Sequence, residues 1–148
     1  AALLTLDALG DDPIELRIDA PDGSLDAAFS LIDVIGTLHV EVRTVGLGLV
    51  GGPAVGVLAC GRDRSLSPHA RVRLAEPRTE VAGRASDIQA AVAEHQRQLE
   101  RFNRHLAAAS GQPLEHIEAD MQQGRYLDAE QALAYGLVDR VLGPGGTR

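Results

Sequence analysis

The sequence contains no tryptophan and no lysine, and only one of its 148 residues is a cysteine. Aromatic residues make up 3% of the chain, so it offers no row of rings on which nucleic-acid bases could stack. A single cysteine cannot form an internal disulfide, and this usage predicts a cytoplasmic protein. No apolar run reaches the roughly 18 residues of a membrane span, and no signal peptide is recognisable. These absences disfavour nucleic-acid-binding, membrane and disulfide-rich secreted classes.

The residues that are present favour one compact domain. Hydrophobic residues account for 45% of the chain, and the formal net charge is -7. A chain of this length is expected to bury roughly two-thirds of its surface in one core. The negative charge disfavours nucleic acid and anionic membranes as partners. We therefore expect a single domain over residues 1–148.

A glycine-rich turn from Gly46 to Gly52 organises the middle of the chain. The β-branched, alternating segment before it, His39–Val45, predicts a strand. The small apolar segment after it, Ala54–Cys60, predicts a buried helix, with Pro53 at its first position. A tight strand–turn–helix is where many hydrolases expose a nucleophile. This turn has the required shape, but it contains no Ser, Cys, Thr, Lys, Asp or Glu.

Strands and helices alternate along the rest of the chain. Residues 62–68 form a polar connection between two of these elements. Ser24 and Asp128 are positioned to cap helices, because a side-chain oxygen there can accept a free backbone N–H. The order predicts an α/β fold with βαβ units and a parallel sheet. The expected strands are Ile14–Asp19, Ala70–Ala75, Arg125–Leu127 and Leu137–Leu142, and the expected helices are Ala1–Leu9, Leu25–Gly36, Ser86–Ser110, Leu114–Met121 and Ala129–Tyr135.

The longest expected helix, Ser86–Ser110, exceeds what a domain of this size needs. About 24 residues span roughly 36 Å. Its middle, Glu94–Gln98, is polar all round, whereas an apolar stripe runs along one side. We therefore expect part of this helix to project and to pack on another subunit. The expected contact positions on the stripe are Ile88, Val92, Leu99 and Phe102.

Several segments resemble the proteolytic subunit of the Clp protease, a serine peptidase family with the wider crotonase-like fold. The resemblance is carried by Gly83-Arg-Ala-Ser-Asp-Ile88, by Gly111-Gln-Pro-Leu-Glu-His-Ile-Glu118 and by the run Arg125–Asp139. Pro21-Asp-Gly-Ser24 is similar to the family's Pro-Gly-Gly-Ser turn. The resemblance implies a head formed by residues 1–82 and 111–142, a handle helix at about 84–110 and a flexible tail at 143–148. It implies no counterpart here of the family's N-terminal gating segment.

The same resemblance implies partners and an assembly. Subunits of the family form seven-membered rings, and two stacked rings enclose a chamber that an unfoldase ATPase feeds. The expected partners are therefore further copies of this chain or a paralogous Clp proteolytic subunit, together with a Clp ATPase. Arg125 is a further expected oligomer contact.

When the chain is aligned with the family on these segments, none of the family's catalytic residues is present. The nucleophile position falls on Gly52, the general-base position on Ala75 and the third triad position on Gly124. Glycine has no atom that attacks a carbonyl, and alanine has none that accepts a proton. The implied oxyanion-hole positions are Gly23 and Pro53, and Pro53 has no N–H to donate. Asp22, which replaces a family glycine, places a carboxylate near the remaining donor.

Three functions follow from these residues, in order of preference. The first is a catalytically inactive Clp-type subunit that shapes a ring or regulates an active paralogue. The second is a crotonase-like enzyme acting on an acyl thioester, which Pro53 and the Gly111-Gln-Pro-Leu114 run argue against. The third is an active serine endopeptidase with unusual catalytic residues.

A relocated catalytic site or a metal site is disfavoured. Cys60 is expected to be a buried, unreactive thiol, since apolar burial raises a thiol pKa. No serine and histidine have a spacing that brings them together, and we expect no metal and no cofactor. The residues considered were Ser24, Ser86 and Ser110 at helix boundaries, Ser65 and Ser67 in a polar loop, His39 and His69 beside strands, and His95, His105 and His116 on polar helix surfaces.

Overall fold

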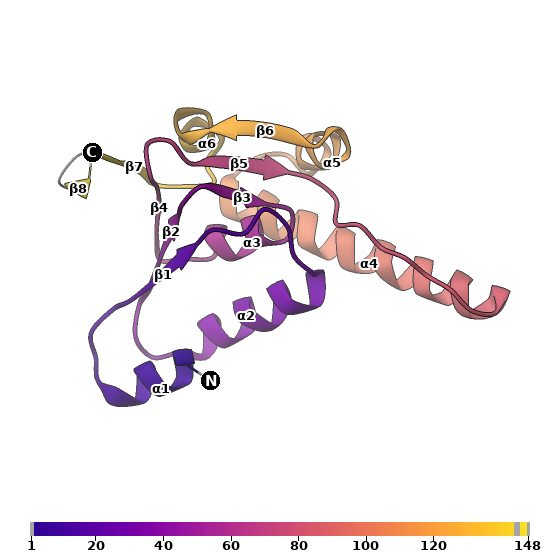
Figure 1. Cartoon of the computed structure of the whole chain (residues 1–148), viewed down its shortest axis with the longest axis horizontal. Helices are drawn as coiled ribbons and strands as arrows, with labels where there is room; N and C mark the ends of the chain where they lie inside the picture. The colour runs from indigo at the N-terminus through magenta and orange to yellow at the C-terminus, as the bar shows by residue number, and fades with distance from the viewer. Residues whose placement is uncertain (1, 144–145, 148) are drawn as a thin grey trace.

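The computed structural model describes residues 2–143 and 146–147, and its elements are shown in Figure 1. A five-stranded sheet has the order β1-β2-β4-β7-β8. Strands β1, β2, β4 and β7 are parallel, and β8 pairs with β7 in the antiparallel direction. Their bounds are Ile14–Ile18, Val42–Gly46, Asp63–Leu66, Arg140–Gly143 and Gly146–Thr147. The predicted parallel βαβ arrangement is thus present.

Local sequence explains how the first βαβ unit forms. Alternation in β1 turns Ile14 and Ile18 into the core. Helix α2, Leu25–Thr37, begins where the Ser24 hydroxyl accepts the N–H of Ala27 at 3.0 Å, as the capping pattern predicted. Helix α1, Ala2–Leu9, precedes this unit and buries none of its residues.

A second, three-stranded sheet carries the positions of most interest. It has the order β3-β5-β6, with β3 at Leu49–Gly51, β5 at Arg71–Leu74 and β6 at Arg125–Asp128. Strand β3 is parallel to β5, and β6 is antiparallel to β5.

Two strands lie where the sequence predicted none. The glycine-rich turn contains β3, and the connection at 62–68 contains β4, in which Ser65 is buried. Neither strand is long enough for its alternation to be visible in the sequence. Strands β3 and β4 form because they pair with neighbouring strands, and this pairing depends on the tertiary structure.

Helix α3, Ala54–Ala59, is the buried centre of the molecule, as predicted from its small apolar residues. The Phe102 ring packs so closely on Gly56 that a Cβ atom there would collide with it. Phe102 also makes an edge-to-face contact with Phe29, with 6.2 Å between the ring centroids. Helices α2 and α3 and the long helix therefore pack together in one core.

The long helix α4 runs over Ala85–Ser110 and ends at Gly111, whose φ is 77°. Its N-terminal part extends past the rest of the chain, whereas its C-terminal part lies against α3 (Figure 1). The buried residues of α4 are Phe102, Asn103 and Leu106, all in the C-terminal part. The second half of the expected handle helix therefore belongs to the core, and only the first half projects.

The C-terminal helices close one end of the molecule. Helix α5 spans Leu114–Gln123, and α6 spans Ala129–Tyr135, where Asp128 and Gln131 form a reciprocal capping box. Buried Asp120 accepts hydrogen bonds from the Tyr135 hydroxyl at 2.7 Å and from Arg125 Nη1 at 3.1 Å. These bonds connect α5, β6 and α6.

The predicted tail is partly paired. Gly143 ends β7, and Gly146–Thr147 forms β8, while residues 144, 145 and 148 of the predicted tail lie outside the described residues. Within the part of the chain that the structure describes, no helix is long and apolar enough to cross a membrane.

Candidate functional site

The second sheet brings the three inferred triad positions to one end of its strands. Gly52 directly follows β3, Ala75 directly follows β5, and Gly124 directly precedes β6. Gly51 lies opposite Arg73, and Leu74 lies opposite Arg125, so the three positions are neighbours. The Gly52 N–H donates to the Arg73 carbonyl at 3.1 Å. Three positions that lie far apart in the sequence therefore share one site, but none contributes a catalytic side chain.

Gly52 occupies a sharp turn between strand and helix. Its φ is +56°, a backbone conformation that favours glycine. Pro53 follows in a helical conformation, and the carbonyls of Gly52 and Pro53 accept the first two N–H bonds of α3 at 3.1 Å each. The strand–turn–helix predicted from the sequence is present. The residue after the turn has no N–H directed at the site.

The N–H of Gly23, the other inferred oxyanion-hole position, is already engaged. The Gly23 N–H donates to Asp22 Oδ1 at 2.8 Å. The same Asp22 oxygen lies 3.0 Å from the point that a Cβ atom on Gly52 would occupy. A negative carboxylate thus stands beside Gly52, where a developing oxyanion would need donors. The sequence placed Asp22 near this donor but did not show that Asp22 engages it.

At Gly124, the inferred third triad position, the neighbouring side chain is the positive Arg73 and there is no carboxylate. Gly124 ends α5 with φ +66°, and Arg73 Nη2 lies 2.9 Å from where its Cβ atom would stand. Arg73 Nε donates to the Gly124 carbonyl at 3.5 Å, and the guanidinium lies 5.1 Å from the centre of the Tyr126 ring. Sequence reasoning did not single out Arg73. Alternation in β5 indicates its outward direction, but its proximity to Gly124 depends on the pairing with β6.

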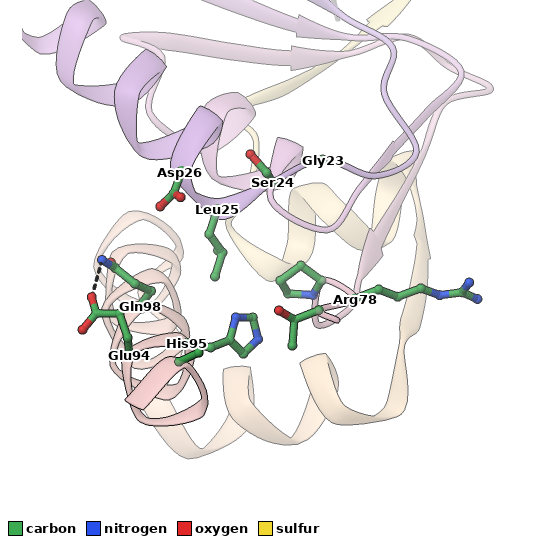
Figure 2. A pocket seen from close by; sticks show the side chains of 11 residues that line it. Gly23, Ser24, Leu25, Asp26, Arg78, Glu94, His95 and Gln98 are labelled. Atoms are coloured by element: carbon green, nitrogen blue, oxygen red, sulfur yellow. Dashed lines mark hydrogen bonds between the residues drawn. The ribbon is translucent and has the colours of Figure 1, made fainter. Parts of the chain in front are cut away.

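A cavity of about 400 Å³ adjoins Gly23. It lies between the start of α2, the segment 77–79 and the projecting part of α4. Figure 2 shows His95 between the α4 residues Glu94 and Gln98 on one side and the segment carrying Arg78 on the other. The Arg78 side chain extends away from this space, and Gln98 donates to Glu94 at 3.1 Å.

Several of the other serines and histidines make contacts within their own chain. His105 is half-buried and lies 3.1 Å from the Gly56 carbonyl, so the expectation that it is exposed is wrong. His39 contacts Asp7, and the Ser110 hydroxyl donates to the Leu106 carbonyl. Among residues 2–143 and 146–147, no hydrogen bond joins a serine hydroxyl to a histidine ring. Over the same residues, no group of three or more His, Cys, Asp and Glu side chains is arranged to hold a metal ion.

The expected oligomer contacts fall into two groups. Val92 is 42% exposed and Ile88 is half-buried, both on the projecting part of α4. Leu99 packs against the core, and Phe102 is completely buried within the chain. Phe102 is therefore corrected from a surface contact to a core residue. Arg125 is 40% exposed in its side chain and points towards Asp120 of its own chain.

Comparisons with known proteins agree on one family. The family profile described as Clp protease matches residues 1–145. The chain is 38% identical over 146 residues to "ATP-dependent Clp protease proteolytic subunit 3" of Synechococcus sp. (strain CC9902), covering 96% of this chain and 73% of that protein. It is 36% identical over 142 residues to the protein of the same name from Rhizobium meliloti (strain 1021), covering 95% and 73% of the two chains.

Proposed function

Because this chain belongs to the Clp protease family, we propose that it is a non-catalytic ring subunit of a Clp-type proteolytic complex. Members of the family form rings with paralogous subunits. In this proposal the chain fills a place in the ring and shapes the chamber, while an active paralogue supplies the peptidase sites. A Clp ATPase is the proposed further partner of the assembled complex.

The observation that carries the proposal is the engaged donor at Gly23. Acyl transfer needs a nucleophile, a base and two donors at the position where negative charge develops. Gly52 supplies no nucleophile, Ala75 supplies no base, and Pro53 supplies no donor. The last donor, the Gly23 N–H, bonds to Asp22 at 2.8 Å. Loss of several independent requirements favours a subunit role over a peptidase with a single altered residue.

The surface of α4 supports the assembly part of the proposal. Its projecting half carries Ile88 and Val92 and buries no residue in its own chain. An apolar stripe on a helix that leaves the core is stabilised when a second surface covers it. A further copy of this chain or a paralogous subunit is the proposed cover. We also propose a cytoplasmic location, in keeping with the single cysteine.

Two measurements on the purified chain test this function. Labelling with a fluorophosphonate probe should produce no adduct, because no serine is activated. Light scattering at micromolar concentration should show an oligomer, and co-expression with an active Clp proteolytic subunit should produce mixed rings. A stoichiometric adduct on a serine would contradict the non-catalytic role. A chain that stays monomeric alone and with the active subunit would contradict the ring role.

A further inference from the structure

Arg73 differs from the other partly buried arginines in lacking an acidic partner. Arg64 pairs with Asp139, Arg125 with Asp120 and Arg140 with Asp63. Among residues 2–143 and 146–147, no carboxylate lies within ion-pair distance of Arg73, which is half-buried. Its guanidinium is thus partly removed from water without the carboxylate that normally offsets that cost.

The guanidinium of Arg73 is held in place but keeps free donors. Nε donates to the Gly124 carbonyl at 3.5 Å, and the guanidinium lies over the Tyr126 ring. Neither Nη atom has a hydrogen-bond partner among the described residues. A guanidinium held against an aromatic ring loses less conformational freedom when it binds a ligand. Its two open N–H edges match the two oxygens of a carboxylate.

Two acidic side chains on neighbouring elements are already engaged. Asp120 accepts bonds from Tyr135 and Arg125. Asp128 lies opposite Arg71 on the paired strands, and its Oδ1 atom accepts the Gln131 N–H at the start of α6. Gly124 contributes no side chain, and Arg73 Nη2 reaches to 2.9 Å from its missing Cβ atom. Neither of these two carboxylates is free for Arg73, so its guanidinium stays open to a carboxylate from outside this chain.

We propose that Arg73, beside Gly124 and against Tyr126, is a binding site for a carboxylate supplied in trans. The carboxylate is either a free one, such as a peptide C-terminus, or an acidic side chain of a second copy of this chain. In both cases the Arg73 guanidinium donates hydrogen bonds to the two oxygens of the carboxylate. Binding of a carboxylate at Arg73 involves no chemical reaction. The proposal therefore does not depend on whether the chain forms mixed rings.

Residue-resolved arginine modification tests the site. Phenylglyoxal reacts with open guanidinium groups, and mass spectrometry measures the rate at each arginine. Acetate at constant ionic strength should slow the reaction of Arg73 several-fold and in a saturable manner, whereas chloride should not. Arg71, two residues earlier on the same strand and exposed, is the internal control and should react at a constant rate.

Protein concentration distinguishes the two sources. If a second copy supplies the carboxylate, Arg73 should be protected at high protein concentration without acetate, and dilution should remove that protection. If the carboxylate is free, Arg73 should react equally at all protein concentrations until acetate is added. A rate at Arg73 that responds neither to acetate nor to protein concentration overturns the proposal, as does equal protection by chloride.

A pair of variants at Gly124 provides a matched control. Gly124→Asp should supply the carboxylate within the chain and protect Arg73 without acetate. Gly124→Ala should bear the same backbone strain at φ +66° but leave Arg73 reactive. Both variants must keep the helix content of the wild type by circular dichroism. Equal protection in the two variants would show that shielding by the added side chain, not a carboxylate, is responsible, and would count against the site.

Discussion

Asp22 Oδ1 lies 2.8 Å from the Gly23 nitrogen and 3.0 Å from the position of a Cβ atom on Gly52. One carboxylate oxygen therefore reaches both the Gly23 N–H, the inferred oxyanion-hole donor, and Gly52, the inferred nucleophile position. A hydroxyl introduced at residue 52 would find an acceptor at Asp22, on the side where a substrate oxyanion would have to bind. On the inferred assignment, the site thus lacks free donors as well as the triad.

Restoring the triad alone should not restore catalysis. Gly52→Ser, Ala75→His and Gly124→Asp together supply a nucleophile, a base and an orienting carboxylate. Each missing oxyanion donor costs on the order of 10²–10³ in rate. Peptide turnover by the triple variant should therefore stay at least that far below the rate of an active family member.

The matched additions to the triple variant are Asp22→Gly and Pro53→Met. Asp22→Gly should free the Gly23 N–H, and Pro53→Met should supply the second N–H. Turnover of a fluorogenic peptide should rise with each addition and most with both. Full activity of the triple variant without either addition would show that the donors were never limiting.

Close packing between Gly56 and Phe102 should make Gly56→Ala destabilising. The added methyl group collides with the Phe102 ring, and overpacking of this kind costs about 1–3 kcal/mol. Chemical denaturation measures the change in the free energy of unfolding. In a double-mutant cycle, Phe102→Leu should reduce the cost of Gly56→Ala, because the smaller side chain vacates the space.

Gly36→Ala is the matched control for this prediction. Gly36 lies in α2, and outside its chain neighbours and the nearby helix backbone no atom lies within 4 Å of its Cβ position. Alanine there should stabilise the chain by about 0.5–1 kcal/mol through its higher helix propensity. Equal effects at Gly36 and Gly56 would contradict the packing explanation.

The ion pair between Arg64 and Asp139 should contribute stability that is lost in acid. The Arg64 hydrogen bond holds the pKa of Asp139 below its usual value, against the opposing effect of partial burial. A lowered folded-state pKa stabilises the native chain above the unfolded-state pKa of about 3.9, and the effect disappears as the pH falls through the folded-state value. Asp139→Asn should therefore destabilise the chain at pH 7, by no more than about 1 kcal/mol since the side chain is 44% exposed.

At pH 2.5 the difference in the free energy of unfolding between the Asp139→Asn variant and the wild type should be smaller than at pH 7. Asp33→Asn is the control, because Asp33 makes no ion pair or hydrogen bond within the described residues. It should have little effect at either pH. A destabilisation by Asp139→Asn that is as large at pH 2.5 as at pH 7 would rule out the ion pair as its cause.

Cys60 should react slowly with thiol reagents in the folded protein. Cys60 follows α3 and is half-buried, not fully buried within the helix as expected. This partial burial still raises the pKa of its thiol to about 11, and the thiol lies 3.0 Å from the Val57 carbonyl. At pH 8 its thiolate fraction, and with it the rate with Ellman's reagent, should be roughly a hundredfold below that of an ordinary thiol. Urea-unfolded protein is the control and should react at the ordinary rate. Equal rates in the folded and unfolded states would contradict the raised pKa.

Local patterns predicted the longer elements well. Ser24, Asp128 and Gly111 mark helix ends through caps and a left-handed turn, and these features depend on a few adjacent residues. The family resemblance assigned Gly52, Ala75 and Gly124 to a single site, and the three are neighbours in space. Short elements were missed because β3 and β4 have only three and four residues and arise from pairing with distant strands.

The sequence by itself determined the order of the longer helices and strands, the buried character of α3 and the absence of reactive side chains at the three inferred triad positions, because these depend on residue identity and short spacing. Tertiary structure decided where the polar groups point. It turned Asp22 onto the Gly23 N–H, brought Arg73 beside Gly124 and buried Phe102 against Gly56. The last two of these contacts link residues on different elements, and only the packing of those elements brings them together.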